Sequence, residues 1–340
     1  MNPLSLVKSL LKRGKTASGD SDETRTDTSV SSGRENEAEQ PPPPPNVDAK
    51  RPEVIALKDD VLVHASENST PRMSGLEIAR DQEIQVLIMI SRTGWLIASD
   101  VARLIWPGKA YGREMAYRLL NRLLKNEEIL ARPAPGCRLF VLSQRGVRRL
   151  RTQTLVKART GKDLAAGYFH HRRLANAFVI ENHIQADSEW PMYRTEYEIQ
   201  SDKKKAYRLG RKVPDGILFD AHSIAWVECE NARKKQADFN RLIDFTLDNF
   251  SRNVWMDDGL RLAEIYFVYE HENAKTRIVN ELIRRYKLER QQSGNPRDWH
   301  DFAHKIIFVQ IQFDKNRICT GLQYDGFQNA LTLFDHGIIE

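Results

Sequence analysis

Cysteine is scarce in this chain, which argues against a disulfide scaffold. The 340 residues contain three cysteines, Cys137, Cys229 and Cys319. They lie far apart and lack the spacing of metal-binding cysteines. Disulfide-stabilised domains carry cysteine at much higher density. The pattern therefore predicts a protein of the reducing cytoplasm.

Long apolar runs are missing as well. No stretch reaches the roughly 18 consecutive apolar residues needed to span a bilayer. Leu4 to Leu11 is short, has basic flanks and is followed by no small-residue cleavage site, so we expect a short amphipathic helix rather than a signal peptide. The net charge is +6 and the pI is near 9.1. This modest excess fits a polyanionic partner, although solubility alone would also explain it.

Within residues 1–75, aliphatic residues are few from Lys15 onwards. That stretch is rich in Ser, Thr, Asp, Glu and Pro, and such a segment cannot bury enough surface to offset its chain entropy. We expect a disordered arm in which Pro41 to Pro45 form a stiff polyproline II rod. The arm would act as a spacer or as a recruitment site for a partner.

Residues 76–151 carry the pattern of a small helical domain with a hairpin. Apolar residues recur at helical spacing, Ser99 and Asp100 suggest a helix start, and Pro133 to Gly136 form a turn. The expected elements are three helices, a hairpin and a last basic helix: Glu77 to Ser91, Val101 to Trp106, Gly112 to Asn126, Ile129 to Ala131 with Arg138 to Leu142, and Gln144 to Arg151. This order is typical of a winged helix-turn-helix domain.

The third expected helix has a basic face opposite its apolar stripe. Residues at positions i, i+3, i+4 and i+7 share this face: Arg118, Asn121, Arg122 and Lys125. Arginine and asparagine are residue types that contact base edges and phosphates in the major groove. Arg113, Arg132 and Arg138 are further candidates for contact with double-stranded DNA. The alternative is a solvated basic face on an ordinary helical domain.

Residues 162–340 form a second expected domain, of mixed α/β class. A helix from Asp163 to Ala186 is followed by three strands, a helix from Ala232 to Phe250, a strand, a helix and a last strand. The order is α-β-β-β-α-β-α-β, which predicts a mixed α/β sandwich. The first of the strands is expected from Met192 to Ile199.

Acidic residues gather on neighbouring strands of this domain. Asp215 follows Pro214, and Glu228 and Glu230 alternate along the next expected strand, so that the two glutamates share a face. If the strands pair as a hairpin, Asp215 and Glu228 meet at its end. Carboxylates so placed can hold a hard divalent cation, with Glu196 of the preceding strand as a further ligand. Solvated carboxylates are the alternative.

Three further groups are candidates for a role at this site. Lys234, just past these acids, supplies a cation that would stabilise a developing phosphate charge. Glu181, on the first helix of the domain, is a weaker metal ligand. Adjacent histidines His170 and His171 point some 100° apart on a helix, so they do not converge on one ion. We expect one to pack and the other to meet DNA or solvent.

The Pro214–Asp215 pair, Glu228 and the order of elements resemble the PD-(D/E)XK superfamily, the fold of restriction endonucleases. The superfamily has Lys where this chain has Glu230. Within the resemblance, either Glu230 acts as a base and Lys234 or Lys235 supplies the cation from the following helix, or the site is inactive. The resemblance implies catalytic roles for Asp215, Glu228, Glu230 and Lys234. It also implies Mg²⁺ or Mn²⁺ held by Asp215, Glu228, Glu230 and Glu196, with the Cys229 carbonyl as a further ligand.

The winged helix-turn-helix followed by Asp215 and Glu228-x-Glu230 also resembles the MobC-type relaxases and the replication-relaxation proteins of mobile elements. That resemblance implies a DNA endonuclease that nicks a transfer origin during plasmid mobilisation or conjugation, with a coupling protein as a partner of the arm. Two alternatives stay open. One is a non-catalytic relaxosome or replication accessory protein, and the other is a winged-helix transcriptional regulator.

Overall fold

The computed structural model describes most of the chain from Met73 onwards. The described residues, all within the unit 60–340, are 73–154, 156–162, 169–185, 190, 192–201, 207–210, 212–230, 234–256, 259–292 and 297–338. The arm expected over residues 1–75 lies outside them except for its last three residues, as do Leu4 to Leu11 and Pro41 to Pro45. No helix in the described part is long and apolar enough to cross a membrane.

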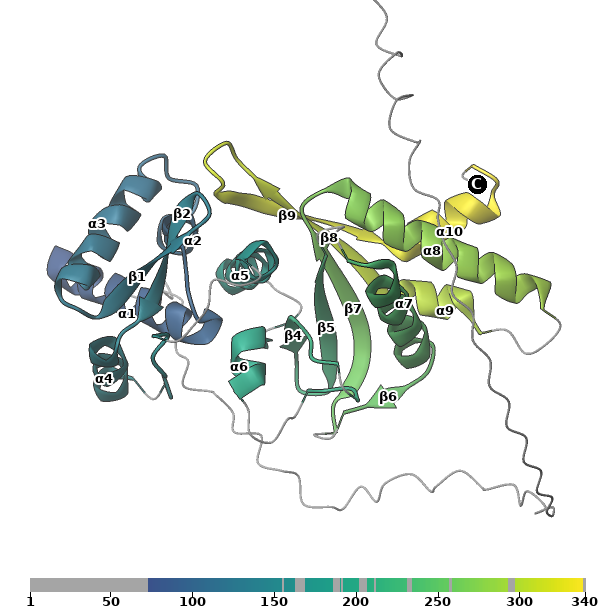
Figure 1. Ribbon diagram of the computed structural model, residues 1–340, viewed down its shortest axis with the longest axis horizontal. Coiled ribbons are helices and arrows are strands. Elements are labelled where there is room, and N and C mark those ends of the chain that lie inside the picture. Colours follow the sequence, from purple (N-terminus) through teal and green to yellow (C-terminus); the bar gives the residue numbers. More distant parts are fainter. Residues whose placement is uncertain are drawn as a thin grey trace, which may run out of the picture. The chain divides into compact units, whose positions relative to one another are not determined.

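The described chain begins with four helices and a hairpin, which we call the α1–α4 unit (Figure 1). Its elements are α1 (Gly75–Thr93), α2 (Ala98–Ile105), α3 (Gly112–Lys125), β1 (Ile129–Ala134), β2 (Cys137–Leu142) and α4 (Gln144–Gln153). β1 and β2 pair antiparallel, and Leu96 adds an isolated bridge to Phe140. The helices and the hairpin expected from the sequence are thus present in the expected order.

Serine side chains cap the starts of α1 and α4 in this unit. The Ser143 side chain accepts hydrogen bonds from the backbone N–H groups of Arg145 and Gly146 at the start of α4. The start expected for α2 was wrong, because this helix begins at Ala98 and not after Asp100. Asp100 lies inside the first turn, where its carboxylate accepts a hydrogen bond from Ile97 N at 3.0 Å. Helix α2 therefore gains a turn at its amino end.

A seven-stranded mixed sheet is the centre of the rest of the described chain. The strands are β3 (Met192–Thr195), β4 (Gly216–Phe219), β5 (Ser223–Glu230), β6 (Val254–Trp255), β7 (Arg261–Tyr269), β8 (Ile306–Phe313) and β9 (Cys319–Gly326). Their order is β3-β4-β5-β7-β8-β9, and β6 pairs with the start of β7. The pairs β5–β7 and β7–β8 are parallel, and the other pairs are antiparallel. The mixed α/β class expected from the sequence is confirmed.

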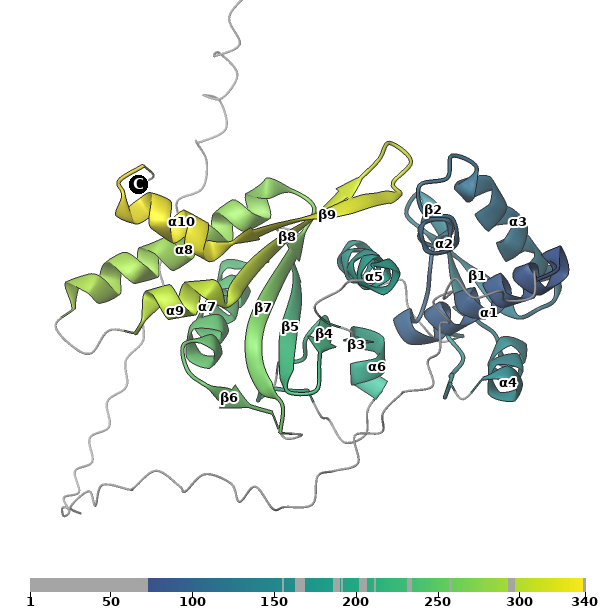
Figure 2. The ribbon, with the colours of Figure 1, turned by 180° about the vertical axis from the view of Figure 1, so that it is seen from behind.

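Helices cover both faces of this sheet (Figures 1 and 2). They are α5 (Phe169–Ile184), α6 (Glu196–Ser201), α7 (Gln236–Phe250), α8 (Glu272–Gln291), α9 (Trp299–His304) and α10 (Phe327–Asp335). Side chains alternate along β5, so Ala225, Val227 and Cys229 pack with α5, whereas Ile224 and Trp226 pack with α7 and α8. Glu228 and Glu230 continue the second series.

The strand expected from Met192 to Ile199 was wrong in its second half. Strand β3 stops at Thr195, and the next residues form α6. Alternating Tyr193, Thr195, Tyr197 and Ile199 mimic the period of a strand. Thr195 and the glutamate three residues later exchange hydrogen bonds as a capping box, which starts a helix instead. Glu196 is therefore the first residue of a helix rather than a strand residue.

Candidate metal centre and its ion pairs

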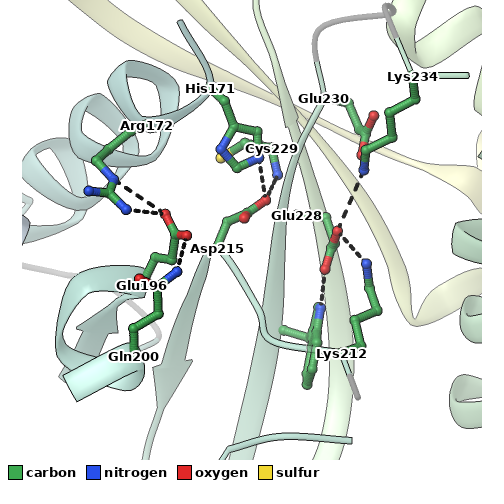
Figure 3. A network of polar contacts seen from close by, with 11 residues as sticks. His171, Arg172, Glu196, Gln200, Lys212, Asp215, Glu228, Cys229, Glu230 and Lys234 are labelled. Carbon is green, nitrogen blue, oxygen red and sulfur yellow. Dashed lines mark hydrogen bonds and ion pairs between the residues drawn. The ribbon is translucent and has the colours of Figure 1, made fainter. Parts of the chain in front are cut away.

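Three side chains from three elements converge beside the end of β5. They are His171 of α5, Glu196 of α6 and Asp215, which immediately precedes β4. One ligand atom from each lies within 4.8 Å of the other two. Figure 3 shows the His171 imidazole pointing at Asp215, with Glu196 nearby. Together they offer a donor set of one nitrogen and two carboxylate oxygens.

Backbone pairing places both acids of this group. At the end of the β3–β4 ladder, the Glu196 N–H donates to the Asp215 carbonyl at 3.1 Å. The Asp215 N–H in turn donates to the Val227 carbonyl at 3.0 Å, which ties Asp215 to β5. Cys229 N donates to the Asp215 carboxylate at 2.7 Å. The carboxylate is thereby held toward α5.

His171 and Asp215 form an ion pair, with 2.8 Å between Nε2 and Oδ2. Burial alone would lower the pKa of His171, but the charge and hydrogen bond of Asp215 outweigh it and raise that pKa. Burial would also raise the pKa of Asp215, yet His171 and the Cys229 N–H keep it below its ordinary value. Each partner therefore favours the charged form of the other.

Sequence reasoning did not assign His171 to the metal group. The argument that His170 and His171 cannot share one ion is consistent with the structure, because His170 is exposed and lies edge-on to Phe169. His171 is half-buried and faces acids rather than apolar side chains. The adjacent pair of histidines does not by itself indicate a metal ligand, since only the tertiary fold brings one of them to Asp215.

Glu228 is held by other partners than Asp215. Its carboxylate accepts from Trp226 Nε1 at 2.6 Å and from Lys212 Nζ at 2.9 Å, and Lys234 Nζ lies 3.9 Å away. Burial, followed by the charge of Asp215, raises the pKa of Glu228 against the opposing effect of the two lysines. The metal group found among the described residues does not include Glu228 or Glu230.

Glu230 forms an ion pair with Lys234, four residues further along the chain. Burial raises the pKa of Glu230 more than Lys234 lowers it. Burial would lower the pKa of Lys234, but Glu230 and then Glu228 raise it, so this lysine stays charged. The Lys234 carbonyl accepts from Arg277 of α8 at 3.1 Å, which fixes the start of α7.

Every acid of the site thus has a basic partner. Besides the pairs described above, Arg172 NH2 lies 3.0 Å from the Glu196 carboxylate. Arg172, Glu196 and Asp215 also line a pocket between α5 and α6. A divalent ion at His171, Glu196 and Asp215 would have to replace the His171 proton and draw Glu196 from Arg172. The mixed nitrogen and oxygen donors fit Mn²⁺ better than Mg²⁺, which prefers oxygen ligands alone.

Glu181 lies outside this metal group. It is fully buried and paired with Arg103 of α2, with 2.5 Å between Nε and Oε1. Glu181, the weaker candidate for a metal ligand, therefore belongs to an ion pair that joins α2 to α5. Lys235, the other lysine considered as a source of the cation, directly precedes α7.

The DNA-contact candidates fall into two groups in the structure. Asn121, Lys125 and Arg138 are exposed. The other four bond within the protein, although the first three of them are exposed too: Arg113 to Asn316, Arg118 to Glu114, Arg122 to Glu83, and Arg132 to the Lys162 carbonyl. Tyr111 and Tyr117 are exposed beside them at 55% and 44% and were not singled out from the sequence, where they read as ordinary aromatics. The exposed face of α3 therefore combines cations with aromatic rings.

The comparisons with known proteins add no relative. A scan against protein-family models, a search of curated proteins and a search of solved structures each returned no match to this chain. The assignment of a function consequently depends on the geometry of the residues themselves.

Proposed function

We propose that the protein is a metal-dependent DNA endonuclease that binds duplex DNA through its α1–α4 unit. The observation that carries the proposal is the convergence of His171, Glu196 and Asp215 within 4.8 Å at the end of a sheet. Glu230 is the last residue of β5 and pairs with Lys234, which lies two residues before α7. A metal group beside a permanent cation suits hydrolysis of a phosphodiester.

In this proposal the residues divide the work. His171, Glu196 and Asp215 would hold Mn²⁺ or Mg²⁺, which supplies an activated water and neutralises phosphate charge when bound. Lys234, whose pKa is raised by its acidic neighbours against the effect of burial, stays protonated and would face the developing phosphate charge. Glu230, whose pKa is raised by burial, would take the proton of the attacking water. Glu228 would orient Lys212 and Lys234.

The arrangement of elements supports the nuclease assignment. Antiparallel β3, β4 and β5 are followed by α7 and then by β7, parallel to β5. Apart from α6, which lies between β3 and β4, and the short β6 before β7, this order agrees with the α-β-β-β-α-β order of the PD-(D/E)XK resemblance, with α5 as the first helix. The order of helices and hairpin in the α1–α4 unit agrees with a winged helix-turn-helix. The strand end bearing Asp215 and Glu228 is where that superfamily places its acids.

The biological role in the proposal is nicking of a transfer origin by a relaxase of a mobile element. Its support is the two-part order alone, a helical DNA-binding unit followed by a nuclease-like sheet. A coupling protein would bind the N-terminal arm, and the reaction would occur in the cytoplasm.

A plasmid assay tests the proposed activity. Purified protein is incubated with supercoiled plasmids, with and without a cognate origin, in Mn²⁺ or Mg²⁺. Relaxed circles should form with the wild type and be lost in Asp215→Asn and His171→Ala. Asp238→Asn is the matched control, because Asp238 is an exposed acid paired with Arg241 on α7. Nicking that survives Asp215→Asn would contradict the proposed centre.

One observation favours a second function. Each acid of the site is already neutralised by a basic side chain, an arrangement that also suits a nuclease fold used only to bind DNA. A non-catalytic accessory protein of this kind would bind duplex DNA without nicking it. Tight duplex binding with no metal-dependent nicking of any origin-bearing plasmid would establish that function instead.

A further inference from the structure

The residue before Glu196 is the N-terminal cap of α6. Thr195 N donates to the Glu198 carboxylate at 2.8 Å, and Glu198 N donates to the Thr195 hydroxyl at 3.2 Å. This reciprocal capping box fixes the first turn of α6. Because Glu196 lies between the two capping residues, the box determines where its carboxylate points.

Helix α1 is hydrogen-bonded to that capping box. Arg92, in the last turn of α1, donates from Nε to Glu198 at 2.9 Å and from NH2 to the Tyr193 carbonyl at 2.7 Å. Its guanidinium also stacks on the Tyr193 ring at 3.8 Å. The Thr195 hydroxyl donates to the Arg92 carbonyl. Both the main chain and the side chain of Arg92 therefore hold the start of α6.

Glu196 is thus fixed from two sides. On one side its N–H donates to the Asp215 carbonyl at 3.1 Å, within the sheet. On the other side its neighbours Thr195 and Glu198 are bonded to Arg92 of the α1–α4 unit. A shift of the end of α1 would move Glu196 relative to Asp215, whose own carboxylate is bonded to β5.

We propose that Arg92 is a positioning residue that couples DNA binding by the α1–α4 unit to divalent metal binding at His171, Glu196 and Asp215. This inference rests on the proposed function, since it uses the same metal centre. Coupling of two binding events is reciprocal, so duplex DNA should change the Mn²⁺ affinity by the same factor as Mn²⁺ changes the DNA affinity. Removal of the Arg92 contacts should reduce that factor.

The other bonds between these parts do not reach Glu196 in the same way. Asn176 of α5 donates to the Trp95 carbonyl at 2.9 Å, and Arg103 binds Glu181, so both join α5 to the α1–α4 unit without a bond to the capping residues. Arg159 donates to the Tyr197 carbonyl at 3.2 Å, within α6 itself. Arg92, by contrast, bonds the Glu198 carboxylate of the capping box itself.

Calorimetric titration of the full chain with Mn²⁺ tests the inference, with and without a mixed-sequence duplex several helical turns long. Arg92→Ala should weaken Mn²⁺ binding by about tenfold, the lower end of the usual effect of an outer-shell partner. It should also bring the Mn²⁺ affinities with and without DNA closer together. Arg92→Lys and Glu198→Gln keep the side-chain size and should show the same trend to a smaller extent. Arg241→Ala, on an exposed pair, is the control.

The outcomes separate this inference from the proposed activity. Unchanged Mn²⁺ affinity in folded Arg92→Lys and Glu198→Gln, with binding lost in Asp215→Asn, overturns the coupling and leaves the metal centre standing. A wild type that binds Mn²⁺ but never nicks DNA, and whose Mn²⁺ affinity still depends on Arg92 and on the duplex, overturns the nuclease and supports the coupling. A wild type that binds no Mn²⁺ overturns both. Circular dichroism of each variant establishes that it is folded.

Discussion

Removal of one partner of the buried ion pair between Arg103 and Glu181 should cost a large share of the stability. Both guanidinium donors lie 2.5 Å from the two carboxylate oxygens. The Glu181 side chain is 0% exposed and that of Arg103 is 19% exposed. Arg103→Ala would leave the carboxylate buried without a partner, which costs about 3–5 kcal/mol. Since a folded domain is stable by only about 5–15 kcal/mol, this change should be easily measured.

Urea denaturation followed by tryptophan fluorescence measures the loss. Arg103→Ala should lower the free energy of unfolding by the amount given above. Arg103→Met combined with Glu181→Leu should restore most of it, because apolar residues often replace a buried pair at little cost. The exposed pair of Arg241 with Asp238 gives the contrast, and Arg241→Ala should cost less than about 1 kcal/mol. An equally small loss for Arg103→Ala would refute the buried-pair account.

Three further predictions concern pH, metal and DNA. Burial raises the pKa of Asp100 from 3.8 to about 6, so stability present below the unfolded value is lost as pH rises from about 4 to about 6, by roughly 3 kcal/mol. Asp100→Asn should abolish this dependence in urea titrations at several pH values, and an unaltered pH profile would contradict it. Mn²⁺ must displace the His171 proton, and the pKa of His171 is raised. The Mn²⁺ affinity measured by calorimetry should therefore fall as pH drops through that raised value. His171→Ala should remove this pH effect and weaken Mn²⁺ binding more than Mg²⁺ binding. Lys125→Ala and Arg138→Ala should each reduce the salt slope of duplex binding by about 1, whereas Arg122→Ala, whose side chain pairs with Glu83, should reduce it less; equal slopes in fluorescence anisotropy would place Arg122 on the DNA.

Elements with a strong period could be predicted from the sequence. The amphipathic helices α3 and α8 and the apolar strand β7 fall within a few residues of the expected ranges, because burial of one face imposes the pattern. Short elements such as β6 and α9 were missed, since their length is set by neighbours rather than by their own sequence. At α6 a capping box competes with strand-like alternation, and the local hydrogen bonds decide the outcome.

The candidate site could be predicted only in part, for a related reason. The acids Asp215 and Glu196 were expected from strand order, and the β3–β4 ladder does bring them together. His171 comes from a helix that precedes Asp215 by more than forty positions, and no local pattern indicates which face of that helix meets the sheet. Lys212 was missed because it lies on an isolated bridge with Leu209, outside any regular strand. Contacts between residues far apart in the sequence depend on how the whole domain packs, and no short segment of the sequence determines that packing.

The partners of the acids suggest how the site would divide between metal and phosphate. Glu228 and Glu230 are 2% and 3% exposed, and carboxylates so deeply buried require cations. Their partners, Lys212 and Lys234, are flexible ammonium groups that can turn from a carboxylate toward a phosphate without losing charge. Asp215 is paired instead with His171, the one partner that can release its proton near neutral pH. In the proposed site a metal would enter on the His171 side, where the His171 proton must leave and Glu196 must turn from Arg172, and the scissile phosphate would meet the lysines.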